Sequence, residues 1–363
     1  MLRFLTAGES HGPALTCIIE GLPAGIRIDM REIDAELARR QRVPGRGERM
    51  KIEQDTVAIL SGMRGGLTLG SPLTMQIVNR DHVNWAETMH PHLPASGAKV
   101  TCPRPGHADY PGMVKYGFDD ARNVLERASA RETAMRTAIG AVARQALRVK
   151  GISIYGRVAE LGPLRLGAQE PTEEAFMAAK EQPFSADANR ASAAEEMLAA
   201  CRAEGVSVGG VIEVAAFHLP IGLGSYVHAN RRLDGLIAGA LMSIPAVRGV
   251  EIGEAFSQAR HAPGAPGDSL QYDIEKGIHY VGNANAGLAG GMSTGQPLLV
   301  RCAVKPIPTL APSRTVDLAT LSEAAPVRER SDVTAVFAAV VVAEAVLAWV
   351  LLCALVESPA KWP

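Results

Sequence analysis

The chain has 363 residues, of which 47% are hydrophobic and 21% are charged, which is enough apolar sequence to bury one large core. Its 37 basic and 38 acidic residues give a formal net charge of -1, so no overall field attracts the protein to nucleic acid or to a membrane surface. Any site for an anion must therefore be local.

Capping signals and hydrophobic periodicity predict a mixed α+β fold. Residues 29–32 (DMRE) have the spacing of a capping box and predict a helix that runs to about Arg42. Residues 129–132 (SARE) repeat this spacing and predict a longer helix that ends at Gly151. Further helices are predicted at 172–181, 189–203, 229–243 and 340–356, and strands at 13–20, 56–60, 73–78, 152–160, 210–217, 248–256 and 298–304.

The domain organisation is expected to be simple. The polar, alanine-rich segment from about 165 to 207 is expected to cover one face of the fold. Neither a linker nor a repeat with a period of about 20 to 50 residues divides the chain. We therefore expect a single domain over residues 1–357, followed by a short tail at 358–363.

A long apolar run from Val333 to Val356 could cross a membrane by its length alone. Glu344 lies near its middle, where a carboxylate is costly in lipid, and no cluster of basic residues flanks the run. We therefore expect a buried strand or turn that leads into a core helix, and no contact with a membrane.

The five cysteines occur singly, without a CxxC pair, which favours reduced thiols and predicts no disulfide. The first residues lack the basic, apolar and small-residue segments of a signal peptide. Both features lead us to expect a cytoplasmic protein.

Two histidines lie in loops rich in glycine or proline. GESHGPAL, at residues 8–15, holds Ser10 and His11 between two glycines, and RPGHAD, at residues 104–109, holds His107. Either loop alone is compatible with an ordinary polar turn or with a structural histidine. Because imidazole titrates near neutral pH, the presence of both favours acid catalysis. His90 and His92 have no cysteine or carboxylate cluster at ligand spacing beside them, so we expect no metal site.

A basic segment follows the first predicted helix. Glycines at positions 45 and 47 interrupt it, so it is expected to form a bent loop. Guanidinium groups on such a loop can converge on one phosphate or carboxylate. A solvated face and an RNA-binding patch are the alternatives, and an aromatic content of only 4% weakens the second. The basic residues are Arg39, Arg40, Arg42, Arg46, Arg49 and Lys51.

Three other segments bear on ligand binding. Arg127 and Ser129 lie at the start of the long predicted helix, where an anion is favoured, although Ser129 could simply cap the helix. The glycine-rich segment 282–297 lacks the lysine and hydroxyl residue of a Walker A loop, and no GxGxxG follows a strand. The segment 305–309 (KPIPT) follows a predicted strand and is suited to contacts with a planar, phosphorylated ligand.

Together these segments resemble the chorismate synthase family. The matching motifs occur in the family's order across nearly the whole chain. They are GESHGPAL, RRQ at 39–41, GRGERMKIE at 45–53, LSG at 60–62, RPGHAD, RASARETAMR at 127–136, GGMSTGQP at 290–297, KPIPT and RSDVTAV at 330–336.

The resemblance implies a β-α-β sandwich fold, a homotetramer and a defined reaction. The reaction is the 1,4-anti elimination of phosphate and a C6 proton from 5-enolpyruvylshikimate 3-phosphate, which gives chorismate. It implies reduced FMN as a cofactor that is not consumed. NADPH enters only if the enzyme reduces its own flavin, and an external flavin reductase is the alternative. An RNA-binding protein and a flavin oxidoreductase are the competing hypotheses.

The resemblance also implies roles for individual residues. His11 corresponds to the acid near the leaving phosphate, and His107 to the histidine that protonates the N1 side of the flavin. Ser10, Ser129 and Asp332 correspond to a relay that serves N5. The substrate phosphate would contact Arg40, Arg46, Arg49 and Arg131. The flavin would contact Arg127, Ala128, Ser129, Gln258, Ala259, Gly290, Lys305, Pro306, Ile307, Pro308, Thr309 and Arg330.

The chain departs from the family's usual pattern at four positions. Val43 and Pro44 stand where an aromatic residue is usual, Ala289 stands where an acid is usual, and Phe337 stands where proline is common. These differences are expected to alter loop details and flavin affinity more than the reaction itself.

Overall fold

The structure is a computed structural model of the whole chain. It describes residues 2–47, 54–94, 96–167, 171–182, 184, 187–263, 267–275, 277–308, 314–327 and 332–358.

Four antiparallel strands form the N-terminal sheet. In spatial order they are β1 (Arg3–Ala7), β2 (Ala14–Glu20), β6 (Leu73–Val78) and β3 (Ala58–Ser61). Alternate side chains of β2, namely Leu15, Cys17 and Ile19, are buried, so one face of this sheet packs on the core. Leu5 and Ile18 stand opposite each other on the other face and are exposed.

Five antiparallel strands form the second sheet. In spatial order they are β10 (Val247–Ile252), β15 (Leu298–Val304), β9 (Gly210–Phe217), β7 (Ser153–Leu161) and β8 (Leu164–Arg165). Ile212 and Val214 of β9 are fully buried on the inner face. On the outer face, Arg157, Glu213 and Arg301 stand side by side in register and form ion pairs at 2.7 and 3.5 Å. The inner face of this sheet, like that of the first, therefore turns toward the core.

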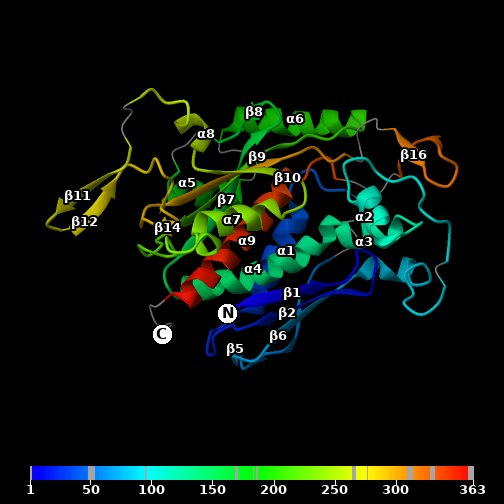
Figure 1. Cartoon of the computed structure of the whole chain (residues 1–363), viewed down its shortest axis with the longest axis horizontal. Coiled ribbons are helices and arrows are strands. Elements are labelled where there is room, and N and C mark those ends of the chain that lie inside the picture. The colour runs from blue at the N-terminus through cyan, green and yellow to red at the C-terminus, as the bar shows by residue number, and fades with distance from the viewer. Residues whose placement is uncertain are drawn as a thin grey trace.

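Helices lie between the two sheets (Figure 1). They are α1 (Met30–Arg42), α4 (Thr133–Arg148), α9 (Val336–Glu357) and, beside α9, α7 (Leu233–Met242). The helices α4 and α9 cross in close contact at Gly140, where a Cβ atom would lie only 2.2 Å from the Cα atom of Ala345. Glycine at this position allows the two backbones to approach each other.

The apolar helix α9 is long enough to span a membrane, but 78% of its most apolar window is buried inside the protein. Its Glu344 carboxylate forms ion pairs with Arg39 of α1 and with Arg144 of α4, the latter at 3.0 Å. The same carboxylate accepts a hydrogen bond from the backbone N–H of Gly156 at 2.7 Å. The expectation of a buried core helix is confirmed, and the helix begins four residues earlier than predicted.

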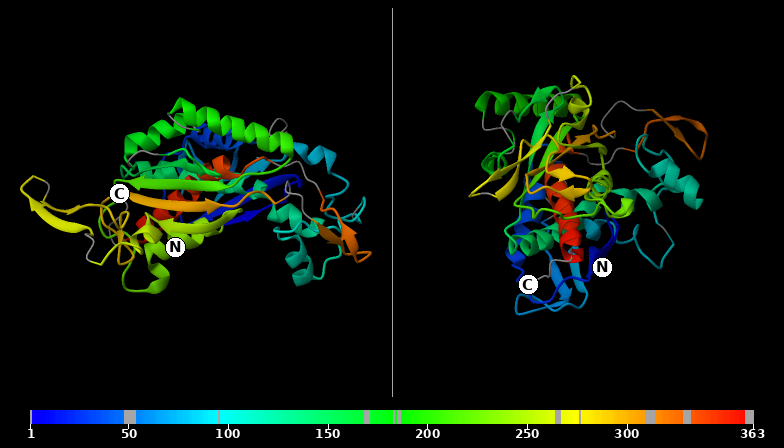
Figure 2. Two further views of the ribbon diagram at one scale, coloured as in Figure 1. Left: turned by 90° about the horizontal axis from the view of Figure 1, so that it is seen from above. Right: turned by 60° about the vertical axis from the view of Figure 1, so that its left-hand side comes forward.

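Segments outside the central layers are shorter. The helix α5 (Glu173–Glu181) places Phe176 against Ala215 and Phe217 on the outer face of the second sheet, and α6 (Ala188–Glu204) contacts β8. The hairpin of β11 (Ser269–Asp273) and β12 (Gly277–Val281) projects from one end of the molecule (Figure 2). The remaining pieces are β4 (Met63–Arg64), β5 (Leu67–Thr68), β13 (Leu288–Ala289), β14 (Met292–Ser293), β16 (Thr315–Asp317), β17 (Ser322–Ala324), α2 (Asp109–Tyr116), α3 (Arg122–Ala128), α8 (Ala255–Gln258) and the 3-10 turns η2 (Arg80–Asn84), η3 (Ala130–Glu132) and η4 (Ala229–Arg231).

Most predicted elements occur, and three need correction. The predicted strand 248–256 ends at Ile252, because Gly253 turns the chain with a φ of 59° before α8. The predicted helix 229–243 divides into η4 and α7, because Arg232 between them is extended. The long helix predicted from residue 129 begins at Thr133, since Ser129 ends α3 and caps the short turn η3.

The crossing of α4 and α9 gives a stability prediction. Alanine has the higher intrinsic helix propensity, but Gly140→Ala inserts a Cβ atom into the backbone of α9, so we expect it to lower the free energy of unfolding by about 1–3 kcal/mol. The control Gly239→Ala lies on α7 with no atom within 4 Å of the new Cβ and should be neutral or stabilising by about 0.5–1 kcal/mol. Urea unfolding measures both, and equal effects would contradict the close contact.

Candidate active site

One cavity of about 500 Å³ gathers loops from both sheets and the first residues of α4 and α9. Its size is within the range of about 300–1,000 Å³ that is usual for small-molecule sites. Twelve of the residues singled out from the sequence line it: Ser10, His11, Arg40, Arg46, His107, Ala128, Ser129, Arg131, Lys305, Ile307, Pro308 and Asp332.

His11 is held in the loop between β1 and β2 by contacts on several sides. Its Nδ1 atom lies 2.9 Å from both carboxylate oxygens of Glu126 on α3, and its ring stacks on Trp85 with centroids 4.1 Å apart. Gly8 turns the loop with a φ of 106°, and a Cβ atom there would lie 2.3 Å from the carbonyl oxygen of Ala14. Gly8, three residues before His11, is therefore a steric requirement of this loop.

Glu126 was missed by the sequence analysis as a site residue, although it stands directly before the RASARETAMR motif. Burial raises the pKa of this carboxyl, but hydrogen bonds and charge from His11, together with the charge of Arg122, lower it more. The net pKa lies below the ordinary value, so Glu126 is an anion at neutral pH.

His107 lies in a loop that is fixed from two sides. Arg104 donates two side-chain hydrogen bonds to the buried carboxylate of Asp109, at 2.7 and 3.0 Å, and Lys305 donates to the carbonyl of Gly106 at 2.8 Å. Burial, and then the charges of Arg104 and Lys305, lower the pKa of His107 to about 4. Its Nε2 atom is buried and has no hydrogen-bond partner among the described residues.

A cluster of buried arginines forms a second part of the cavity wall. Asp55, which is 3% exposed, pairs with Arg40 at 3.1 Å and with Arg131 at 2.6 Å. Burial, followed by the charges of Arg46 and Arg131, lowers the pKa of Arg40 to about 10. The Arg40 Nε atom is buried without a hydrogen-bond partner in the part of the chain that the structure describes. Guanidinium groups gathered in this way favour an incoming anion.

The segment 43–47 after α1, which carries Arg46 and is called the arginine loop, contacts the segment 332–335 directly before α9. Asp332 pairs with Arg46 and accepts the backbone N–H of Gly47 at 2.7 Å. Gly45, with a φ of 80°, lies so close to Thr334 that a Cβ atom would stand 2.6 Å from its methyl carbon. These contacts bring residues almost 300 positions apart in sequence to one side of the cavity.

The two serines of the expected relay are neighbours, since the Ser129 hydroxyl donates to the Ser10 hydroxyl at 3.2 Å. Asp332 lies on the same cavity, where its carboxylate contacts the arginine loop. The three expected relay residues therefore share one cavity, and the direct contact is between the two serines.

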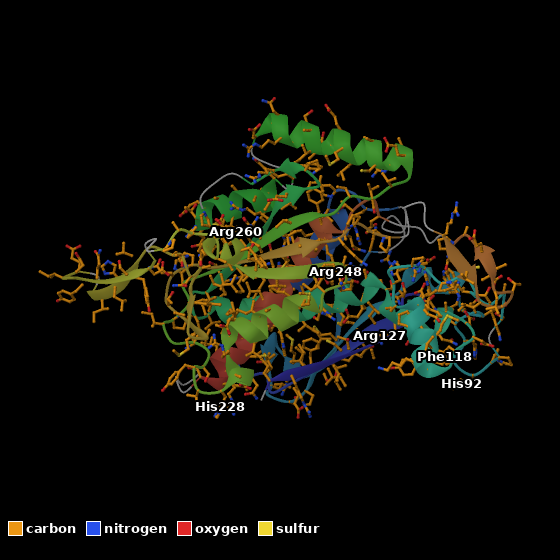
Figure 3. All side chains as sticks on the ribbon, turned by 45° about the horizontal axis from the view of Figure 1, so that its top comes forward. His92, Phe118, Arg127, His228, Arg248 and Arg260 are labelled. Carbon is orange, nitrogen blue, oxygen red and sulfur yellow. The ribbon has the colours of Figure 1, made fainter. Side chains whose placement is uncertain are left out.

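Four other residues that were predicted to contact the flavin are not among the described residues that line the cavity. They are Arg127, Gln258, Ala259 and Gly290. The exposed Arg127 side chain donates to the carbonyls of Thr6 and Gly8 at 3.0 and 3.1 Å and so braces the His11 loop. Gln258 and Ala259, at the end of α8, and Gly290, between β13 and β14, lie at the other end of the molecule from α3 (Figure 1). Figure 3 shows the same separation between Arg127 and Arg260, the residue after Ala259.

The other predicted site residues are Pro306, Arg49, Thr309 and Arg330. Pro306 adjoins the cavity residues Lys305 and Ile307. Arg49, Thr309 and Arg330 lie outside the described residues. Among the described residues, no group of three or more histidine, cysteine, aspartate or glutamate side chains could hold a metal ion.

Two of the departures from the family pattern have a structural setting. Phe337 is the second residue of α9, is 2% exposed and packs edge-to-face on Phe184 at 5.3 Å. Ala289 pairs with Met292 in the small hairpin of β13 and β14. Neither side chain is among the described residues that line the cavity.

Comparisons with known proteins agree on one family. The sequence model described as "Chorismate synthase" matches residues 2–356. Curated relatives named chorismate synthase are 51% identical in Desulforudis audaxviator, over 98% of this chain and 93% of the relative, and 47% identical in Caldicellulosiruptor saccharolyticus, over 98% and 95%. A solved structure titled "Crystal Structure of Chorismate Synthase" superposes with a TM-score of 0.77 at 38% identity, covering 98% of this chain and 92% of that one.

The environment of His107 predicts how stability depends on pH. Its folded pKa of about 4 lies below the ordinary value of 6.5, so unfolding takes up a proton between these two pH values. This contribution to stability is complete above about pH 6.5 and is lost as the pH falls toward about 4. We expect the free energy of unfolding of His107→Gln to fall less steeply over this range than that of the wild type. Urea unfolding across the range measures both, and parallel curves would contradict a buried neutral imidazole.

Proposed function

The chain belongs to the chorismate synthase family, and we propose that the cavity around His11, His107 and the arginine cluster is where its reaction takes place. The enzyme is a carbon–oxygen lyase that converts 5-enolpyruvylshikimate 3-phosphate into chorismate, the last step of the shikimate pathway toward aromatic amino acids. The observation that carries the site proposal is that two imidazoles and four guanidinium groups line one cavity.

The substrate phosphate would bind in the arginine cluster. Arg40 and Arg131 share the single carboxylate of Asp55, so the cluster retains an excess of positive charge. Arg46 lines the same cavity, and its charge acts on Arg40. Arg49 would complete the set. Bidentate hydrogen bonds to phosphate oxygens would hold the substrate with its leaving group fixed in place. Desolvated arginines would then stabilise the charge that develops on the departing phosphate.

Reduced FMN is the cofactor that the family implies, and the cavity suits it in two respects. Ala338, Ala339 and Val342 of α9 supply an apolar wall against which a planar ring can lie, and the buried Nε2 atom of His107 offers a polar contact. Ala128, Ser129, Lys305, Ile307 and Pro308 would hold the cofactor. When bound, it supplies electron density to the substrate as phosphate leaves and recovers it afterwards, without net redox change.

Proton movements would fall to the two histidines. His11 would donate a proton from Nε2 to the leaving phosphate, because its Nδ1 atom is occupied by Glu126. His107, neutral at pH 7 in the absence of ligand, would take up a proton at Nε2 when an anionic partner lies beside it. The hydrogen-bonded pair Ser129 and Ser10, together with Asp332 on the same cavity, would relay a proton to the cofactor. The reaction would also require that water and oxygen are kept away from the reduced flavin.

We also propose that the enzyme is a homotetramer with the β-α-β sandwich fold of its family. The predicted flavin contacts Gln258, Ala259 and Gly290 are distant from the cavity within one subunit, which supports their contribution from a neighbouring subunit. The exposed apolar side chains of Tyr272 and Ile278 on the projecting hairpin are candidates for burial in such an assembly.

The cellular setting is likewise a proposal. We propose that the enzyme works in the cytoplasm, where its single cysteines remain reduced, and that residues 1–357 act as one domain. Flavin reduction would come from NADPH if it is intrinsic, or from an external reductase.

The reaction predicts a defined assay result. Anaerobic mixing of the protein with reduced FMN and 5-enolpyruvylshikimate 3-phosphate should release phosphate while the flavin absorbance returns to that of the reduced form. No turnover under these conditions would contradict the proposal. Consumption of NADPH in the absence of substrate, with no phosphate release when the substrate is added, would instead indicate an oxidoreductase.

A substitution tests the role of His11. We expect His11→Ala to lower kcat by about 10²- to 10⁴-fold, because a positioned general acid contributes an effect of this size. Circular dichroism should show an intact fold. The matched control His92→Ala removes an imidazole from an exposed loop that does not line the cavity and should keep wild-type turnover. Equal rates for the two variants would remove His11 from the mechanism.

A further inference from the structure

We propose that Glu126 is the positioning residue of His11: it selects the ring nitrogen that exchanges the proton and supports the positive charge on the ring. This inference deepens the proposed function, since it rests on the role of His11 as the acid at the leaving phosphate. His11 lines the cavity, whereas Glu126 is not among the described residues that line it.

The contact between the two residues is extensive. Both Glu126 carboxylate oxygens lie 2.9 Å from His11 Nδ1, and one of them also accepts the backbone N–H of His11 at 2.9 Å. The carbonyl of Glu126 accepts the N–H of Ser10 at 3.0 Å. His11 and Glu126 are only 6% and 3% exposed. Side chain and backbone of one residue of α3 therefore hold both the ring and its loop.

This geometry determines the tautomer of the imidazole. An ionised carboxylate can only accept hydrogen bonds, so the proton on the Glu126 side must reside on Nδ1. Nε2 is then the atom of His11 that gains and loses a proton. An imidazole oriented by a buried carboxylate in this way is the arrangement that serves proton transfer in other enzymes.

Other charged groups also lie near the His11 ring. Asp81 of η2 places an oxygen 4.0 Å from Nε2, and its neighbour His82 contacts the backbone carbonyl of His11 at 2.9 Å. Arg122 opposes them, because it pairs with Glu126 at 2.9 Å and stacks over Trp85 at 4.8 Å from the ring centre. Among the described residues, the carboxylates of Glu126 and Asp81 thus lie beside the two nitrogens of the His11 ring, and a nearby anion stabilises a protonated histidine.

A purely structural role for Glu126 would consist of anchoring the loop. Glu126→Gln separates the two roles, because glutamine has nearly the same shape and keeps an acceptor for the His11 N–H, but lacks the charge. Arg122→Met changes the charge in the opposite sense and keeps an apolar stem over Trp85. The control Glu132→Gln removes a carboxylate from the adjoining turn that bonds to Thr6 and Arg136 rather than to His11.

The direct test is an NMR titration of the full-length, ligand-free protein labelled with ¹⁵N-histidine, with the His11 signal assigned by its loss in His11→Asn. We expect Glu126→Gln to lower the titration midpoint of His11 by about one pH unit or more, and Arg122→Met to raise it. The control should leave it unchanged. A His11 midpoint that is the same in Glu126→Gln and in the wild type overturns the proposal.

Kinetics give a second readout that loop anchoring alone would not produce. For Glu126→Gln we expect kcat to fall roughly ten- to a hundredfold with little change in KM. The alkaline limb of the kcat profile should move to lower pH, because the acid loses its proton earlier. A loss of kcat with an unmoved profile would indicate a structural role only and would overturn the proposal.

Two further outcomes remain decisive. If Glu126→Gln does not fold, as judged by circular dichroism, Arg122→Met carries the test, and an unmoved His11 midpoint in that variant overturns the proposal. The titration needs no turnover. Absence of phosphate release by the wild type would therefore refute the proposed function without deciding whether Glu126 controls the His11 proton.

Discussion

The close contact between α4 and α9 is the constraint on which the rest of the structure depends. These helices cross where Gly140 meets the backbone at Ala345, and each begins at the cavity, α4 with Thr133 and α9 after Ala335. Glu344 then ties α9 to α1 and to the second sheet through one buried carboxylate. Since the arginine loop follows the end of α1, the position of the arginine-lined wall of the cavity depends on the packing of the helical layer.

Most basic side chains that line the cavity share one arrangement, in which a carboxylate lies beside the basic group. Glu126 contacts His11, Asp55 holds Arg40 and Arg131, and Asp332 pairs with Arg46. Burial of such groups carries a large desolvation cost, which these pairs offset before any ligand arrives. For the proposed reaction, these pairs would organise the cavity in advance for a phosphate ester, so that less reorganisation would be needed at the moment of reaction.

Helices, strands and motifs could be predicted from the sequence better than the contacts between residues that are far apart in it. The bounds of β6, β9 and β15 agree with the structure, because alternation and continuous apolar runs are local signals. Glu126 and Asp55 were missed as site residues, since their importance lies in contacts with residues up to 115 and 76 positions away. The short helices α2 and α3 were missed for a related reason: both are polar and are held by long-range contacts such as that between Glu126 and His11.

The proposed reaction requires that substrate and flavin occupy this one cavity together. A crystal structure of the protein with FMN and 5-enolpyruvylshikimate 3-phosphate tests that requirement most directly. We expect the phosphate to contact Arg40 and Arg131, His11 to face the leaving oxygen, and the flavin ring to lie between His107 and α9. Binding of either molecule at another surface, with the arginine cluster unchanged, would contradict the account.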